Sequence, residues 1–194
     1  FEYGYFLEYC SKLSVIDGNS ELQLQQKSRT NVEVIPVKEN ISDTYHVTKE
    51  GTMFEISGGK YVFPFLLPRE VAIAIVMCKE TVDYLGLPFN PSFSTFTMPP
   101  GRGSVFAGVK QTTLIDSTYN ANFGSIKAML VMFAASKEKK KWVILGDMLE
   151  LGKEEQEEHE KLAKILASMD IEKVILYGSL VEKYTLPQLK KLGK

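Results

Sequence analysis

The second half of the chain alternates between short apolar runs and helical stretches, and this alternation limits the possible folds more than any other feature. A β-type run over Trp142–Leu145 is followed by an acidic helical pattern from about Lys153 to Ser168, and then by a β-type run over Val174–Tyr177. Strands joined by a helix favour parallel pairing through a right-handed crossover. We therefore predict an α/β fold with a mainly parallel sheet.

The first half predicts smaller elements and a boundary. The glycines of Ser57-Gly58-Gly59 indicate a hairpin, because glycine accepts a positive φ. A helical run begins at Pro68 and is closed by Gly86, as is typical of helix ends. The segment Leu87–Gly103 is rich in proline, serine and threonine, so we predict domains over residues 1–103 and 104–194. The other expected elements are helices over Tyr3–Leu13, Glu21–Lys27 and Ser125–Lys137 and strands over Ser14–Asp17, Val32–Val37, Ser104–Ala107 and Gln111–Asp116.

Charge and apolar content exclude some classes of partner. The 194 residues carry 23 basic and 24 acidic side chains, a net charge of -1, so no overall field favours nucleic acid or an anionic membrane. The apolar runs Val71–Cys78 and Ala128–Ala135 are far shorter than the ~20 residues of a membrane span. Cys10 and Cys78 lie in apolar helical patterns, which predicts reduced core cysteines in a cytoplasmic protein. Because the chain begins at Phe1 and stops just after a helical run, we expect a piece of a longer polypeptide.

Polar side chains follow the carboxyl ends of the predicted strands, where open α/β sheets bind ligands. Asp116 ends one strand and is followed by a cluster of hydrogen-bonding residues that includes Tyr119. The carboxylate could accept a bond from a sugar hydroxyl, and the aromatic ring could stack on a base. The same residues could equally make the turn and cap the next helix, and the spacing leaves both interpretations open.

Two more positions carry candidate chemistry. The carboxylates Asp147 and Glu150 lie in a glycine-bounded segment after the next strand. They could coordinate a metal or receive an amine, although capping of the acidic helix is favoured on spacing alone. Arg102 lies in a glycine-flanked loop and suits a phosphate, because a guanidinium binds oxyanions through parallel bonds; a solvated linker arginine fits equally.

Charged residues along the helices are interpreted as ordinary surface. The run Lys137–Lys141 is expected to be a solvated helix end, and Glu154–Glu160 an exposed acidic turn or two. His159 lies inside that acidic run. A lone histidine on a helix is expected at the surface, or supporting other residues, more often than in catalysis.

Several of these segments occur in a characteristic order. Pro100-Gly101-Arg102 precedes the strand that enters Asp116-Ser117-Thr118-Tyr119-Asn120-Ala121-Asn122, and later come Leu145-Gly146-Asp147-Met148-Leu149-Glu150-Leu151-Gly152 and His159. This order resembles the Mur ligase family, and the D-x-x-Y-N-A-N and L-G-D-M-x-E-L-G blocks together are specific. The likeness is strongest from about Pro99 to Gly178, and is greatest to the branch that adds D-alanyl-D-alanine to a UDP-linked muramoyl tripeptide.

This resemblance implies a three-domain enzyme. The chain would hold the latter part of a central ATPase-type α/β domain (residues 1–103) and most of a C-terminal Rossmann-like domain (residues 104–194), which we expect to continue past Lys194. Such a ligase uses ATP and Mg2+ to activate a carboxylate as an acyl phosphate, which an amine attacks to form an amide in peptidoglycan-precursor synthesis. The implied partners are a UDP-linked muramoyl peptide and D-alanyl-D-alanine or an amino acid. The phosphate-binding loop and the magnesium ligands would lie before Phe1. We therefore expect the 194 residues by themselves to be catalytically inactive.

The resemblance also implies roles for individual residues. Arg102 is similar to the family arginine that approaches the ATP phosphates when the enzyme closes, and it is the catalytic candidate. Asp116, Tyr119 and Asn120 match the nucleotide side of the site. The implied substrate-facing residues are Asn122, Ser125, Asp147 and Glu150.

Two departures from the family pattern keep an alternative open. The usual G-x-H-N-x-x-N block is missing at residues 67–72, and Ser117 stands where this branch commonly has a second aspartate. A non-catalytic, ligase-like module that binds a nucleotide or a protein partner is therefore the alternative function. A ligase from the folate-adding or cyanophycin-making side of the superfamily fits less well, because of the Tyr-Asn-Ala-Asn block.

Overall fold

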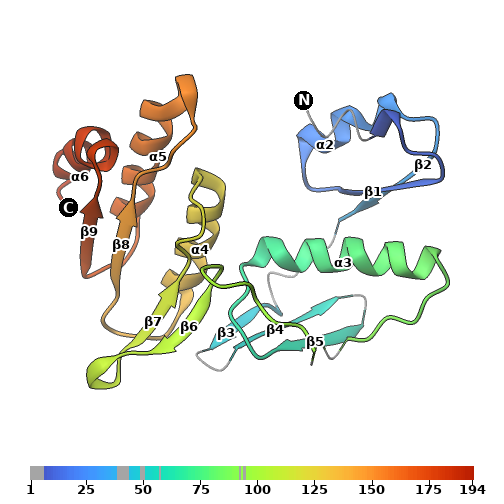
Figure 1. Ribbon diagram of the computed structural model, residues 1–194, viewed down its shortest axis with the longest axis horizontal. Coiled ribbons are helices and arrows are strands. Elements are labelled where there is room, and N and C mark those ends of the chain that lie inside the picture. The colour runs from blue at the N-terminus through green and yellow to red at the C-terminus, as the bar shows by residue number, and fades with distance from the viewer. Residues whose placement is uncertain (1–6, 39–43, 49–50, 57, 92, 94) are drawn as a thin grey trace. The chain divides into compact units, whose positions relative to one another are not determined.

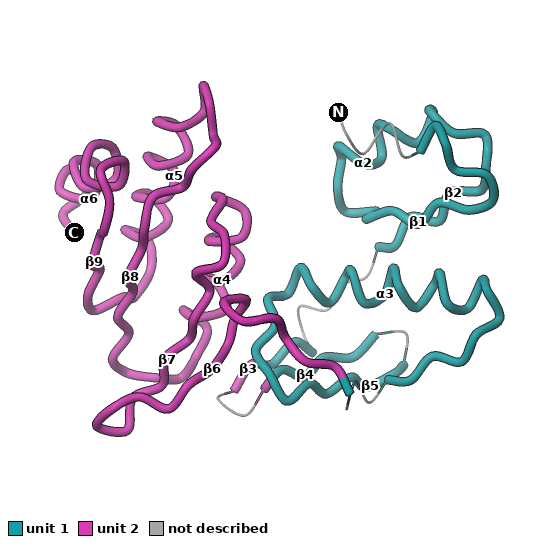
Figure 2. Tube along the Cα trace, viewed as in Figure 1, with its two compact units in different colours: residues 1–46, 52–95 teal, residues 47–51, 96–194 magenta. Residues whose placement is uncertain are grey.

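The computed structural model describes residues 7–38, 44–48, 51–56, 58–91, 93 and 95–194 (Figure 1). The chain divides into two compact units, which we call unit 1 (residues 1–46 and 52–95) and unit 2 (residues 47–51 and 96–194), as Figure 2 shows. Each is described by itself. Among the described residues, no helix is both long enough and apolar enough to cross a membrane.

Unit 1 contains a parallel strand pair whose connection includes a short helix. Ser20 starts that helix, because its hydroxyl accepts a hydrogen bond from the Gln23 amide at 3.3 Å, as serine commonly does at a helix start. Both strands occur within one residue of their predicted ranges. The helix predicted over Tyr3–Leu13 lies partly outside the described residues, and Leu13 itself belongs to a strand. The elements are β1 (Leu13–Asp17), α2 (Glu21–Gln25), the 3-10 turn η1 (Gln26–Arg29) and β2 (Glu33–Val37).

A three-stranded sheet and a long helix follow. The hairpin predicted around Gly58 is confirmed, because the strands on either side pair antiparallel with Ile56 opposite Gly59; Ser57 lies outside the described residues. The long helix begins after Pro68, and Gly86 follows its end with φ +65, as predicted. The elements are β3 (His46–Thr48), β4 (Gly51–Ile56), β5 (Gly59–Phe63) and α3 (Arg69–Tyr84), with the strand order β3-β4-β5.

The cysteine on α3 corrects a prediction. Ala72 and Val76 form the buried side of the helix, one turn apart. Cys78 lies two positions beyond Val76, and a step of two residues turns a helix to nearly its opposite face. Cys78 is exposed as a result, so the expectation of a core cysteine is wrong at this position.

Unit 2 has the alternation of strands and helices that the sequence predicts. Its last two strands pair in parallel, with Ile144 opposite Ile175, and the acidic helix connects them. The two strands before them form an antiparallel hairpin with Ser104 opposite Asp116. The elements are β6 (Ser104–Ala107), η2 (Val109–Gln111), β7 (Thr113–Asp116), α4 (Phe123–Ala135), β8 (Trp142–Gly146), η3 (Gly152–Glu154), α5 (Glu155–Ser168), β9 (Lys173–Tyr177), the π-helical η4 (Val181–Thr185) and α6 (Leu186–Lys191).

Two predicted boundaries in unit 2 are wrong for local reasons. Strand β7 begins at Thr113, because Lys110 and Gln111 have φ angles of 54 and 61 and cannot continue a strand. Helix α4 ends at Ala135, two residues before the predicted end. The lysine run that follows is not wholly solvated: Lys141 is buried, and its Nζ donates to a carbonyl in the last turn of α4 at 2.7 Å.

The core of unit 2 reaches the loop that follows β8. Met148, from that loop, is fully buried among side chains of α4, α5 and α6. Strands β7, β8 and β9 all run toward the same edge of the unit, the upper edge in Figure 1. The segments that follow these strands therefore gather at one edge, as expected for a ligand site of an α/β domain. The buried cluster consists of Leu130, Val143, Met148, Leu162, Ala163, Leu166, Ile171 and Leu189.

Candidate functional site

The loop before β6 is tied to the segment after β7. The Gly103 amide donates to the Asp116 carbonyl at 2.8 Å, and the Tyr119 amide donates to the Gly101 carbonyl at 3.1 Å. Gly101 has φ +72, and a Cβ there would lie 3.0 Å from the Tyr119 amide nitrogen, so glycine suits this approach best. The arginine between these two glycines is therefore held at the end of β7 and does not lie in a free linker.

Arg102 lies over the ring of Tyr119, with 4.5 Å between the guanidinium carbon and the ring centroid. The tyrosine is 68% exposed, and at such sites a cation–π contact contributes about 0.5–1 kcal/mol. A guanidinium has five N–H donors, so Arg102 can bind an oxyanion while it keeps this contact. The structure thus brings Arg102, Tyr119 and Asp116 together at the end of β7.

Asp116 and Asn120 shape the turn between β7 and α4. The Oδ1 atom of Asp116 accepts a hydrogen bond from the Thr118 amide at 3.0 Å, which is an Asx turn. The Oδ1 atom of Asn120 accepts from the Ala121 amide at 2.8 Å. Asp116 is half-buried and Asn120 is exposed. Turn formation, which the sequence left open as an alternative, is therefore one role of both side chains.

Asn122 and Ser125 form the start of α4. The Asn122 side chain accepts from the Ser125 amide at 2.9 Å, and the Asn122 amide donates to the Ser125 hydroxyl at 3.3 Å. This reciprocal pair is a capping box, which satisfies amides that a helix start would otherwise leave unpaired. Asn122 thus caps the helix, as the alternative for the segment after β7 predicts, and both side chains are exposed.

Asp147 joins the ends of two neighbouring strands. Its Oδ1 atom accepts hydrogen bonds from the Leu180 and Val181 amides at 3.0 and 2.8 Å, at the start of the helical segment after β9. A Cβ on Gly178, whose φ is +136, would collide with the Asp147 carboxylate. The spacing favoured a cap on the acidic helix that follows Asp147. The structure shows that this carboxylate instead caps the helical segment that follows β9.

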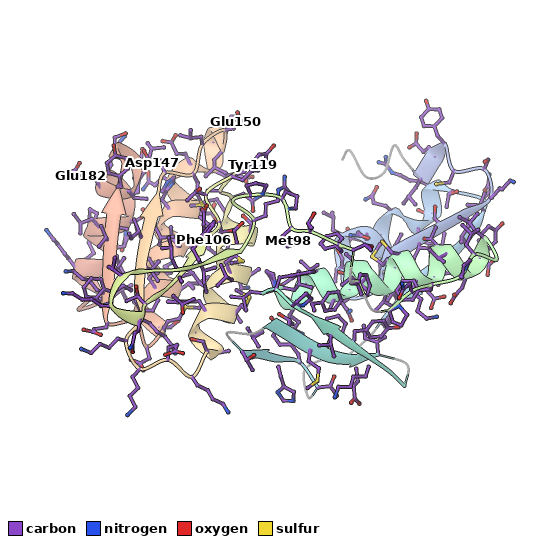
Figure 3. The ribbon with its side chains drawn as sticks, turned by 60° about the horizontal axis from the view of Figure 1, so that its bottom comes forward. Met98, Phe106, Tyr119, Asp147, Glu150 and Glu182 are labelled. Atoms are coloured by element: carbon purple, nitrogen blue, oxygen red, sulfur yellow. The ribbon has the colours of Figure 1, made fainter. Side chains whose placement is uncertain are left out.

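Glu150 lies at the apex of the same loop in a strained backbone conformation. Its φ is +63, in the left-handed region that non-glycine residues seldom adopt, and its side chain is exposed. Such conformations cost about 1–3 kcal/mol and occur mostly where the surroundings enforce them, often at ligand sites. Figure 3 shows Glu150, Asp147 and Tyr119 along one edge of unit 2.

His159 was expected either at the surface or in support of other residues, and its contacts fit the second expectation. It is fully buried, its Nε2 accepts from the Met148 amide at 3.2 Å, and its Nδ1 lies 2.7 Å from the Glu155 carbonyl oxygen. The expectation of a surface position is therefore wrong. A signal was available, because His159 stands three and seven residues before Leu162 and Leu166, the spacing of one buried helix face.

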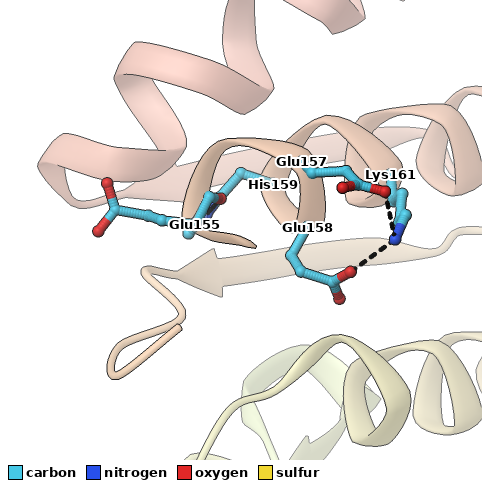
Figure 4. Close-up of polar contacts among 5 residues, drawn as sticks. All are labelled: Glu155, Glu157, Glu158, His159 and Lys161. Carbon is cyan, nitrogen blue, oxygen red and sulfur yellow. Dashed lines mark hydrogen bonds and ion pairs between the residues drawn. The ribbon is translucent and has the colours of Figure 1, made fainter. Parts of the chain in front are cut away.

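Two acidic residues beside His159 form ion pairs with Lys161, which Figure 4 shows; Glu157 is exposed and Glu158 is half-buried. The Nζ of Lys161 lies 2.9 Å from a Glu157 carboxylate oxygen and 2.7 Å from a Glu158 one. These hydrogen bonds raise the pKa of Lys161, and the bond from Lys161 lowers the pKa of Glu157. In the part of the chain that the structure describes, no group of three or more His, Cys, Asp and Glu residues could hold a metal ion.

With this geometry in place, comparison with known proteins defines the class. Residues 101–191 match the family model described as Mur ligase, glutamate ligase domain. These 91 residues match a Mur ligase C-terminal domain and make up slightly less than half of the 194-residue chain.

Curated relatives match this chain over part of its length. A UDP-N-acetylmuramoyl-tripeptide–D-alanyl-D-alanine ligase of Mycobacterium tuberculosis is 31% identical over 72 residues, which is 34% of this chain and 14% of that protein. The protein of the same name from Rickettsia prowazekii is 30% identical over 119 residues, which is 60% of this chain and 26% of the relative. The chain therefore spans a minor part of the curated relatives that it matches.

Solved structures give the same fold. MurF from Acinetobacter baumannii superposes with a TM-score of 0.77 at 16% identity, covering 91% of this chain and 40% of that one. The MurF ligase of Thermotoga maritima in complex with ADP superposes with a TM-score of 0.66 at 16% identity, covering 92% and 54%. The chain thus has a MurF-like α/β fold, which confirms the predicted fold class.

Proposed function

We propose that this chain is part of an ATP-dependent ligase that joins D-alanyl-D-alanine, or a single amino acid, to a UDP-linked muramoyl peptide in peptidoglycan-precursor synthesis. The observation that carries this proposal is the placement of Arg102 over Tyr119, beside Asp116, by the two backbone bonds of the glycine-flanked loop. The names of the relatives from Mycobacterium tuberculosis and Rickettsia prowazekii support the choice of substrates.

The residues at the end of β7 fit a nucleotide such as ATP. The in-plane donors of Arg102 suit a phosphate, where charge grows during phosphoryl transfer. The Asp116 carboxylate suits a ribose hydroxyl through its second oxygen, since Oδ1 already accepts from the Thr118 amide. In this proposal Tyr119 and Asn120 also lie on the nucleotide side. ATP, when bound, activates the substrate carboxylate as an acyl phosphate.

Magnesium has no proposed ligands in this chain. The described residues contain no cluster that would hold such an ion, and the resemblance places the ligands in a region that would precede Phe1. We therefore assign the described residues no part in holding Mg2+. The phosphate-binding loop is assigned to the same missing region, so we propose that the 194 residues by themselves do not turn over.

The loop after β8 is proposed to face the substrates. Glu150 is exposed at its apex, where a carboxylate would attract the ammonium group of an incoming amino acid or dipeptide. We propose that Asn122 and Ser125 line the same face. Asp147 contributes chiefly by holding the loop, because its Oδ1 is engaged by two backbone amides.

Two broader assignments complete the proposal. Residues 1–103 are proposed as the latter part of the central ATP-binding domain and residues 104–194 as the C-terminal domain. The substrates of such an enzyme are made in the cytoplasm, which is where we place the protein.

The test is ATP-dependent phosphate release by the full-length protein that contains this chain. We expect release only when the UDP-linked muramoyl tripeptide and D-alanyl-D-alanine are both present. Replacing the dipeptide by single amino acids identifies the second substrate. Absence of release with a folded protein that carries a phosphate-binding loop would refute the ligase and favour the non-catalytic, nucleotide-binding module.

A further inference from the structure

The segment from the end of β8 to the start of η3, residues 146–152, is anchored at two adjacent positions. At the first, the Asp147 carboxylate accepts from the Leu180 and Val181 amides, which begin η4. At the second, the Met148 amide donates to Nε2 of the buried His159. The Met148 side chain is fully buried as well, so both its backbone and its side chain are fixed.

The contacts of His159 define a single protonation state. A carbonyl oxygen can only accept, so the Nδ1 atom that faces the Glu155 carbonyl at 2.7 Å must carry a proton. A backbone amide can only donate, so the Nε2 atom that faces the Met148 amide must offer its lone pair. The ring is therefore neutral, with its proton on Nδ1. If the ring were charged, its Nε2–H would face the Met148 N–H, and neither donor would have an acceptor.

The two anchors belong to one closed circuit of contacts. The far end of η4 returns to the histidine, because the buried Thr185 hydroxyl donates to the His159 carbonyl at 3.1 Å. The loop thus holds the start of η4 through Asp147, η4 holds α5 through Thr185, and α5 holds the loop through His159. Each bond fixes the position of the partner for the next.

Glu150 lies two residues beyond the second anchor. Its left-handed backbone, with φ +63, persists only if its surroundings enforce it. The turn η3 (Gly152–Glu154) begins on its other side, so Glu150 lies between two fixed points. Its exposed carboxylate is thereby directed outward at the edge where β8 ends.

We propose that His159 is a positioning residue that fixes residues 146–152 through the Met148 amide and so orients Glu150 toward the ammonium group of the amine substrate. The second half of this statement rests on the proposed ligase function; the first half does not. His159 itself touches no substrate. A buried histidine that merely fills the core would support folding equally, and the tests below separate the two roles.

The first test uses the 194-residue chain and needs no activity. Nitrogen NMR of the imidazole at neutral pH is expected to show a neutral ring protonated on Nδ1, and the Met148 amide is expected to exchange with solvent far more slowly than the Glu150 amide. A proton on Nε2, a charged ring, or exchange of both amides at the same rate would overturn the anchoring.

Two variants then separate the two ring nitrogens. In His159→Gln, the terminal amide reaches the place of Nε2 and can accept from Met148; in His159→Asn, it reaches only the place of Nδ1. Protection of the Met148 amide is expected to persist in His159→Gln and to fall by about tenfold or more in His159→Asn. Equal protection in two folded variants would contradict the role of Nε2. The tautomer measurement on the unaltered chain decides the matter if a variant does not fold.

The second test measures kinetics in the full-length protein. His159→Asn and Glu150→Gln are each expected to raise KM for the amine substrate about tenfold, with KM for ATP unchanged, while His159→Gln stays within about threefold of the unaltered enzyme. Equal changes in both KM values would indicate a general structural defect and overturn the positioning role. If the unaltered protein releases no phosphate, the proposed ligase function and the amine assignment fail, whereas the NMR result decides the anchoring independently.

Discussion

Removing the Asp147 carboxylate should destabilise unit 2 by an amount that its contacts allow us to calculate. Its Oδ1 accepts two backbone amides, at 3.0 and 2.8 Å. Hydrogen bonds to a charged group contribute about 1.5–3 kcal/mol each when buried, but Asp147 is half-buried, and loss of a helix cap usually costs about 0.5–2 kcal/mol. We therefore expect Asp147→Ala to lower the free energy of unfolding by about 2 kcal/mol.

The assay is urea denaturation followed by the fluorescence of Trp142, the single tryptophan, which lies in β8 and so reports on unit 2. Asp147→Asn keeps an oxygen acceptor and loses the charge, so it should cost about 0.3–1 kcal/mol. Asp170→Ala removes an exposed aspartate of the same unit and serves as the matched control. A loss below about 0.5 kcal/mol for Asp147→Ala, or equal losses for Asp147→Ala and the control, would refute the capping role.

Three other changes have defined outcomes. Gly178→Ala should lower the stability of unit 2 by about 2 kcal/mol, measured by urea denaturation, because its φ is +136 and the new Cβ would meet a carboxylate. Arg102→Ala and Asp116→Ala should each lower turnover of the full-length ligase about tenfold, since each is expected to supply ~1.4 kcal/mol of transition-state binding; unchanged rates in both would remove the nucleotide assignment. Lys161→Met should return the lowered pKa of Glu157 to its ordinary range in an NMR titration. Because that pKa is lowered on folding, the ion pair stabilises the chain above the ordinary glutamate pKa and ceases to do so as the pH falls through the lowered value.

Local signals accounted for much of the fold. The cap at Ser20, the hairpin around Gly58 and the helix between Pro68 and Gly86 are each decided by residues a few positions apart, and all three are observed. The parallel pairing of β8 and β9 was predictable for a similar reason, because a helix separates them in the sequence. A predicted boundary was wrong where the backbone is strained. Lys110 has a positive φ, so β7 begins after it and not at Gln111.

The roles of the site residues depended on contacts that spacing does not reveal. Asp147 caps a segment more than thirty residues later, a partner that no short motif contains. His159 meets the Met148 amide only because α5 folds back over the end of β8. In contrast, Asn122 and Ser125 are three residues apart, and the capping alternative stated for the segment that ends at Asn122 is what the structure contains. The contact between Arg102 and Tyr119 was not predicted, because the resemblance gave each residue a role toward ATP and said nothing of a contact between them.

The central claim is that the full-length protein forms an amide through an acyl phosphate, and an oxygen-labelling experiment tests it most directly. The muramoyl tripeptide is supplied with heavy oxygen in the carboxylate to be joined, together with unlabelled ATP and D-alanyl-D-alanine. One carboxylate oxygen attacks the γ-phosphorus, and the amine later displaces it as phosphate, so the released phosphate should carry a single heavy oxygen. Release of unlabelled phosphate alone would mean that ATP is hydrolysed without activating the carboxylate, and would contradict the account.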